Sequence, residues 1–231
     1  MTEAKAKVRE VLEALLIAVI FLRFGYSYVA QTFYIPSESM EDTLLIGDHL
    51  FVNRFIFGLE GPLADNPLLP SRGVERGDVV IFRSVEDPRV DVVKRCMGLP
   101  GDRLKMISRK LYVNGVALDE SAYAVHKKPG EMSARPAERP FIHKRDNFDE
   151  ITVPAGHYFC FGDNRDDSHD SRAWGPLPAH HIKGRAQLIY WSYGGGVSRS
   201  SKVSHKVLHF ARTAFGFFTK TRWDRTFLVV R

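Results

Sequence analysis

The feature that most constrains this chain is one apolar stretch, residues 11–35, which Pro36 follows directly. A helix rises about 1.5 Å per residue and the hydrocarbon core of a bilayer is about 30 Å thick, so this stretch is long enough to cross it. Arg23 interrupts the stretch at a cost of about 2.5–3.5 kcal/mol, and the surrounding Leu, Ile, Val and Phe residues offset about 0.3–0.6 kcal/mol each. We therefore expect a single transmembrane helix over residues 11–35.

The residues that precede this stretch bear on whether it is a retained anchor or a cleaved secretory signal. Lys5, Lys7 and Arg9 would suit the basic start of a signal peptide. The apolar run is too long for a signal peptide, however, and no small-x-small cleavage site leads out of it, so a retained anchor is favoured. The positive-inside rule then places residues 1–10 in the cytoplasm and the bulk of the chain on the outer side.

Beyond Pro36 the sequence predicts strands. β-branched runs bounded by turn formers predict strands, and Asn114-Gly115 between two apolar runs predicts a hairpin with a type I′ turn. No segment with a helical period occurs between residues 44 and 193. The predicted strands and hairpin cover residues 77–83, 90–95, 111–116, 151–161 and 182–191.

These strands predict a mainly β domain, an antiparallel sheet or barrel-like fold, over residues 36–193. Residues 120–150 carry Pro129, Pro136 and Pro140 among mixed charges, and we expect an irregular insertion there.

Gly194-Gly195-Gly196 separates this domain from a basic tail, residues 194–231. The tail holds eight basic residues and one acidic residue, so it accounts for the net charge of +6. The folded domain is therefore not expected to bind nucleic acid, and the tail suits anionic lipid headgroups. Residues 207–218 are too short to span a membrane, and we interpret them as an interfacial segment, the alternative being a poorly ordered tail.

The two cysteines and the histidines predict no metal site. Cys96 and Cys160 lie in or beside strand-like runs without a CxxC motif, and we expect small buried thiols, with a disulfide left open. The acidic loop 162–172 lacks the glutamate that a calcium-binding EF-hand needs at its twelfth position. His157, His169, His180 and His181 match no common ligand spacing. We expect neither a metal nor a cofactor.

Three clusters could carry chemistry, and each has an ordinary alternative. Ser37 and Ser39 directly follow the apolar stretch, where a polar turn would also suit. Lys94 follows Val92 and Val93 and is either a base whose pKa burial lowers or an edge-strand lysine that reaches water. Residues 162–172 are either a shaped functional loop or a solvated one.

Taken in order, the three clusters resemble the signature segments of the type I signal peptidase (leader peptidase) family of serine–lysine proteases. Residues 36–44 are similar to the nucleophile segment, residues 94–102 to the lysine segment and residues 162–172 to the third segment, Gly-Asp-Asn-Arg-x-x-Ser-x-Asp-Ser-Arg. Residues 77–82 are similar to the strand before the lysine. The resemblance extends from about Phe33 to Trp191, with residues 84–90 and 103–150 poorly matched.

The resemblance implies a role for each matched residue. Ser39 would be the acylating nucleophile and Lys94 its general base, which requires the lysine pKa to fall from about 10.4 toward 7 at a cost of about 4 kcal/mol. The Ser39 N–H and the Ser37 hydroxyl would form the oxyanion hole. Ser168 would hydrogen-bond Lys94 and Asp170 would pair with Arg172. Gly162 and Asn164 would shape the loop.

The resemblance also implies a substrate and a location. The substrates would be preproteins that bear signal peptides, cleaved after small-x-small residues and bound in extended form at a sheet edge. Location would be the bacterial inner membrane with the catalytic domain on the outer face, and the bilayer and the protein-export translocon would be partners. The walls of the substrate pockets would include Phe33, Ile35, Met40, Leu44, Ile81, Val92 and Val93.

One departure from the family pattern and two alternative functions remain. Asp42 stands where the family usually has proline, and its carboxylate would oppose a neutral Lys94 if it were close, so we expect it to face solvent. Pilin-maturing peptidases of conjugation systems share this chemistry. A membrane-anchored binding protein on a degenerate peptidase fold is the alternative from another class.

Overall fold

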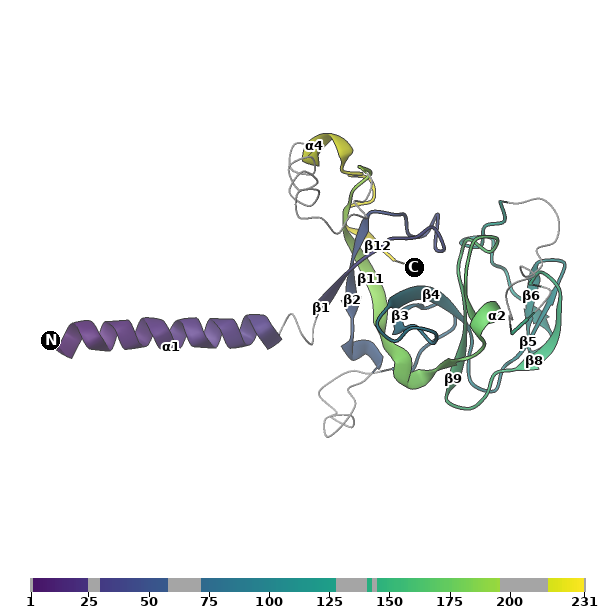
Figure 1. Ribbon diagram of the computed structural model, residues 1–231, viewed down its shortest axis with the longest axis horizontal. Coiled ribbons are helices and arrows are strands. Elements are labelled where there is room, and N and C mark those ends of the chain that lie inside the picture. The colour runs from purple at the N-terminus through teal and green to yellow at the C-terminus, as the bar shows by residue number, and fades with distance from the viewer. Residues whose placement is uncertain are drawn as a thin grey trace.

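The computed structural model describes residues 2–24, 30–57, 72–127, 141–142, 145–195 and 216–230. Its β domain contains two antiparallel sheets, and the long helix α1 (Thr2–Phe24) extends away from it (Figure 1). The remaining helical turns are short: η2 (Phe55–Phe57), α2 (Ser171–Trp174), η3 (Ala179–His181) and α4 (Phe217–Lys220). The mainly β fold expected from the sequence is confirmed.

The larger sheet has the strand order β1-β2-β11-β3-β4-β9-β10, with β12 paired to β11. It pairs β1 with β2, which flank the predicted nucleophile segment, and β9 with β10, which flank the third cluster, while Lys94 lies on β4 itself. Its strands are β1 (Ala30–Tyr34), β2 (Asp48–Asn53), β3 (Val79–Arg83), β4 (Asp91–Gly98), β9 (His157–Phe161), β10 (Leu177–Pro178), β11 (Ile182–Ser192) and β12 (Leu228–Val229).

The smaller sheet has the order β7-β6-β5-β8 and lies beyond β9 in Figure 1. In β5, Leu104 and Met106 are buried while their neighbours are exposed, the alternation of a sheet with one solvated face. Asn114 and Gly115 have φ angles of 53° and 82°, as a type I′ turn requires, which confirms the predicted hairpin. The strands are β5 (Arg103–Ile107), β6 (Lys110–Val113), β7 (Val116–Ala117) and β8 (Phe148–Thr152).

The predicted anchor extended too far toward its C-terminal end. Residues 30–34 form β1, which pairs with β2 through its whole length, and Ile35 is buried in the core at 3% exposure. The polar Gln31 and Thr32 suit a sheet better than lipid. None of the helices in the described part of the chain combines the length and hydropathy needed to cross a bilayer.

Two predictions about the middle of the chain were also wrong in part. The strand expected over 151–161 is two strands in different sheets, because a turn at Pro154–Gly156 with a φ of 69° at Gly156 separates β8 from β9. The insertion expected at 120–150 contributes to the core at its ends, since Ile142 and Phe148 are buried. Residues 128–140 and 143–144 lie outside the described residues.

The β domain does not end at residue 193, where the sequence predicted its boundary with the C-terminal tail. Residues 216–230 return to the larger sheet, where β12 pairs with β11 and Val230 is buried at 4% exposure. Backbone pairing and the burial of Val230 stabilise this return. The glycine-rich residues 194–196 had indicated that the domain ends before the tail. Most of the segment interpreted as interfacial, residues 207–215, lies outside the described residues.

Candidate active site

The predicted nucleophile lies in the turn that joins β1 to β2, residues 37–47, hereafter the nucleophile turn. Backbone hydrogen bonds from Glu41 N to Glu38 O (3.0 Å) and from Leu44 N to Met40 O (2.7 Å) close it. Met40 and Leu44 are buried at 1% and 0% exposure in the main core, which anchors the turn on both sides of Glu41. Ser39 is therefore held on a fixed turn and remains partly exposed.

Lys94 on β4 reaches this serine, its Nζ donating to Ser39 Oγ at 2.5 Å. The lysine is only 3% exposed and forms no ion pair among the described residues. Burial lowers its pKa from 10.5 to about 8, although the carboxylates of Asp170 and Asp163 partly oppose that change. With a pKa of about 8, roughly a tenth of the amine is neutral at pH 7, and this fraction, which can accept a proton, rises with pH.

The loop after β9 fixes the nucleophile turn through its backbone. Asn164 N donates to Ser39 O at 3.2 Å, and Asn164 Nδ2 donates to Glu38 O at 3.3 Å. A Cβ atom at Gly162 would lie 2.1 Å from Ser168 Oγ and 2.4 Å from Ser39 O, so only glycine fits there. Gly162 and Asn164 therefore hold the loop against the nucleophile turn.

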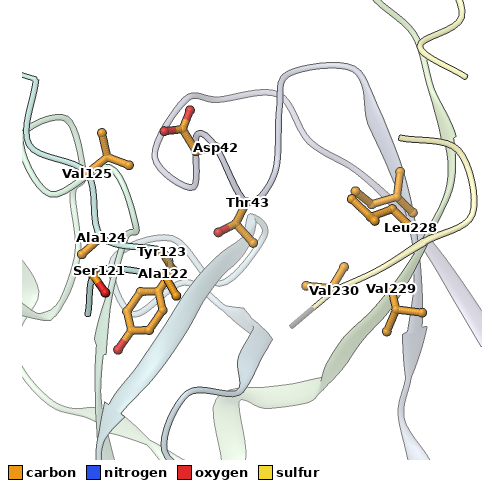
Figure 2. Close-up of a pocket in the computed structure, with 11 residues that line it drawn as sticks. Asp42, Thr43, Ser121, Ala122, Tyr123, Ala124, Val125, Leu228, Val229 and Val230 are labelled. Carbon is orange, nitrogen blue, oxygen red and sulfur yellow. The ribbon is translucent and has the colours of Figure 1, made fainter. Parts of the chain in front are cut away.

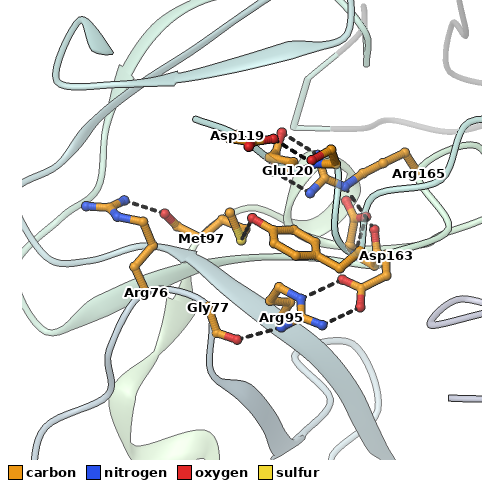
Figure 3. Close-up of polar contacts among 12 residues, drawn as sticks. Arg76, Gly77, Arg95, Met97, Asp119, Glu120, Asp163 and Arg165 are labelled. Atoms are coloured by element: carbon orange, nitrogen blue, oxygen red, sulfur yellow. Dashed lines mark hydrogen bonds and ion pairs between the residues drawn. The ribbon is translucent and has the colours of Figure 1, made fainter. Parts of the chain in front are cut away.

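Asp163 joins the lysine strand to the nucleophile turn, a role that sequence reasoning did not assign. Its carboxylate accepts from Arg95 Nε and Nη2 at 2.8 and 2.7 Å and from Thr43 Oγ1 at 2.6 Å. Figure 3 shows the pair Arg95–Asp163. Arg95 also lies over the ring of Tyr123, 4.3 Å from its centroid. Thr43, Arg95 and Asp163 all stand within the matched motifs. Only the pairing of the strands in the fold shows that they contact one another.

Asp170 pairs with Arg172, as predicted. Arg172 Nε and Nη2 donate to the two carboxylate oxygens at 2.9 and 2.8 Å, and Gly162 N donates to Asp170 Oδ2 at 3.1 Å. Burial by itself would raise the pKa of Asp170, but the charge and hydrogen bonds of Arg172 outweigh it and hold that pKa well below its ordinary value. The pair is buried on both sides and keeps the loop closed.

One predicted supporting residue, Ser168, is placed differently from expectation, and the role of a second, Ser37, is untested. Ser168 is buried at 3% exposure, but its hydroxyl has no hydrogen-bond partner among the described residues, so the expected bond to Lys94 is not formed. Ser37 is exposed two residues before Ser39, and its part in an oxyanion hole stays a prediction.

The predicted pocket walls divide into two groups. Ile35, Met40, Leu44 and Ile81 are buried in one cluster, against which Phe33 and Val93 pack with part of their surface free. Val92 instead packs in a different cluster with Cys96 and Cys160, because neighbouring residues of a strand face opposite sides. Both cysteines are buried free thiols.

Asp42 is exposed and has a φ of 76°, a conformation that the family's usual proline cannot adopt. Its charge is not among those that affect Lys94, so the expectation that it faces solvent is confirmed. Asp42 and Thr43 line a cavity of about 280 Å³ with residues 121–125, Ile189 and residues 228–230 (Figure 2).

Comparison with known proteins identifies the family of this chain. Residues 8–191 match the family model described as signal peptidase, peptidase S26. The chain is 34% identical to a signal peptidase I of Pseudomonas aeruginosa, covering 77% of this chain and 69% of that protein, and 30% identical to a signal peptidase I of Aquifex aeolicus, covering 77% and 81%. A crystal structure of a signal peptidase I from Enterococcus faecalis is 30% identical and covers 49% of this chain and 97% of that one, with a TM-score of 0.38.

The family match takes in the nucleophile turn, β4 and the loop after β9, which are the three segments that meet around Ser39. The chain belongs to the signal peptidase I family, the S26 family of peptidases.

Proposed function

We propose that this chain removes signal peptides from exported preproteins with Ser39 as nucleophile and Lys94 as general base. The observation that carries the proposal is the hydrogen bond between Lys94 Nζ and Ser39 Oγ at a buried amine. A serine hydroxyl needs a base to become an effective nucleophile, and a lysine serves only when it is neutral. The lowered pKa of Lys94, about 8, supports that role.

The reaction then runs through an acyl-enzyme. Lys94 takes the Ser39 proton as Oγ attacks the scissile carbonyl carbon, and the resulting oxyanion accepts hydrogen bonds from the Ser39 N–H and the Ser37 hydroxyl. The protonated amine gives its proton to the leaving amino group, which frees the mature protein. Lys94, neutral again, activates a water that releases the signal peptide from Ser39.

The arrangement of strands supports an extended substrate. Phe33 and Val93 keep part of their side chains free beside the buried Ile35, Met40 and Leu44, so they offer an apolar surface to a substrate. A substrate backbone bound at a sheet edge tolerates varied sequences. We infer cleavage after small-x-small residues.

A precursor with an Ala-x-Ala site tests the proposal. Wild type should cleave it, while Ser39→Ala and Lys94→Ala should be inactive. Lys110→Ala, which removes an exposed lysine of β6, is the matched control and should cleave like wild type. Equal processing by wild type and the two dyad variants would sink the mechanism.

We also infer attachment to the bacterial inner membrane through α1, with the β domain on the outer face. The side chains of Val11, Leu15 and Phe21 are 59%, 56% and 73% exposed, and no part of the β domain covers α1 in Figure 1. The aromatic residues Phe218 and Trp223, in and shortly after α4 (Phe217–Lys220), are 78% and 52% exposed, which suits a lipid interface. Extraction of the chain from membranes by alkaline carbonate would contradict this attachment.

A further inference from the structure

The C-terminal segment, residues 216–230, lies outside the family match yet contacts the nucleophile turn. Its backbone joins β11 through Phe227 N to Ile189 O at 2.7 Å and Val230 N to Gln187 O at 3.0 Å. The Val230 side chain is buried in the cluster that contains Met40 and Leu44. The segment is therefore built into the same core that supports Ser39.

Asp48 is the fixed point of these contacts. It is the first residue of β2, directly after the nucleophile turn, and is fully buried. Its carboxylate accepts from Leu45 N at 2.8 Å, from Ser192 Oγ at 2.6 Å and from Arg225 Nη2 at 2.7 Å. A buried carboxylate is costly unless it is paired, so Asp48 requires a cation from the C-terminal segment.

Arg225 supplies that cation and also holds the turn. Its Nη2 donates to the carbonyl oxygen of Thr43 at 2.9 Å in addition to Asp48, and its side chain is 13% exposed. The neighbouring Arg222 contacts Ile46 O at 2.7 Å and Asp48 Oδ1 at 3.4 Å, nearer the end of the turn. Of these two arginines, Arg225 contacts the turn backbone nearer in sequence to Ser39.

Thr43 is thus fixed from two sides. Its hydroxyl donates to Asp163, which is paired with Arg95 next to Lys94, while its carbonyl accepts from Arg225. The bond from Leu44 N to Met40 O passes this constraint across the turn to the residue after Ser39.

We propose that Arg225 is a positioning residue that, anchored on buried Asp48, holds the nucleophile turn so that Ser39 Oγ stays opposite Lys94. This inference rests on the proposed function. It assigns the basic C-terminal segment to the active site, because two of its arginines are directed into the β domain. The alternative is an ion pair that only stabilises the fold.

The test compares full-length Arg225→Gln with the matched control Lys220→Gln, which removes an exposed positive charge from the same segment. For Arg225→Gln we expect kcat to fall about tenfold or more, the effect of one lost hydrogen bond to a charged group, with KM within about twofold. A looser turn admits water to Lys94, so the rise of kcat with pH should move to higher pH. Arg225→Lys keeps the charge opposite Asp48 and should recover part of kcat.

Amide hydrogen exchange separates positioning from plain stability. In Arg225→Gln, exchange should increase in peptides that cover residues 39–45 and stay unchanged in β5 and β6. The proposal is overturned if Arg225→Gln matches Lys220→Gln in kcat and exchange. It is also overturned if exchange rises evenly through the protein with no change in the pH dependence of kcat.

The proposal can still be tested if Arg225→Gln does not fold or if wild type is inactive. If Arg225→Gln does not unfold cooperatively on heating, Arg225→Lys is judged by the same exchange and pH readouts, and wild-type behaviour in both refutes the proposal. If wild type itself fails to cleave any precursor, the proposed peptidase function falls, while the exchange measurement on residues 39–45 still judges the role of Arg225.

Discussion

Replacing Lys94 by methionine should make the protein more stable while it abolishes cleavage. The side chain is 3% exposed, and burial lowers its pKa from 10.5 to about 8. At about 1.4 kcal/mol per pKa unit, keeping this amine protonated inside the protein costs roughly 3 kcal/mol. Methionine has similar length and no charge, and the lost hydrogen bond to Ser39 returns only about 1 kcal/mol of that gain.

The sign of the effect depends on pH. Below about pH 8 the amine is protonated in the folded and the unfolded chain, so wild type bears the full cost of burying a charge. Between about pH 8 and 10.5 the unfolded chain binds more protons than the folded chain, and the stability of wild type rises with pH. The advantage of Lys94→Met should therefore be largest near pH 6.5 and should vanish near pH 10.5.

Denaturant unfolding of wild type and Lys94→Met near pH 6.5 and near pH 10.5 measures this difference. Lys110→Met, at an exposed lysine on β6, is the control and should show a small change that does not depend on pH. An advantage of Lys94→Met that is the same at both pH values would refute the buried, destabilised amine on which the mechanism depends.

Two further substitutions test the geometry around Ser39. Gly162→Ala would place a methyl group 2.1 Å from Ser168 Oγ and 2.4 Å from Ser39 O, so we expect about 1–3 kcal/mol of destabilisation and a fall in kcat of more than tenfold in a folded protein. Circular dichroism and precursor cleavage measure both, and wild-type kcat would contradict the close approach. Asp42→Gly should stabilise the protein by about 0.5–1 kcal/mol because φ is 76°, whereas Asp42→Pro should destabilise it because the ring requires a negative φ. Thermal unfolding distinguishes them, and equal melting temperatures would show that the turn adapts freely.

Local signals predicted the parts of the fold that depend on local chemistry. β3 and β4 follow β-branched runs, and the hairpin at Asn114-Gly115 follows the need for two residues with positive φ. The end of the apolar stretch could not be placed in this way, because Ala30–Tyr34 is apolar enough for lipid and becomes a strand only through pairing with β2. The amino-acid composition of a strand does not indicate which other strand it pairs with.

For the same reason, the sequence predicted only the site residues that stand in local motifs. Ser39, Lys94 and the pair Asp170–Arg172 stand in motifs whose spacing is visible in the sequence, and the structure brings each pair together. The contacts of Asp163 and Arg225 join segments more than 65 residues apart along the chain, and Arg225 lay in a tail whose charge suggested lipid. Charge composition alone does not reveal that an arginine has a buried carboxylate to neutralise.

Strand β4 presents Lys94 and Arg95 in succession, and its pairing with β3 sets Lys94 opposite Val80 and Arg95 opposite Val79. A shift of this pairing by one residue in one direction would put Arg95 in the place of Lys94 and turn Lys94 to the other face of the sheet. A guanidinium, which remains protonated at any physiological pH, would then face the serine and could not accept its proton. A molecule misfolded in this way would contain every matched motif and lack the proposed base, so on the proposed mechanism the fidelity of strand alignment during folding sets the fraction of active molecules.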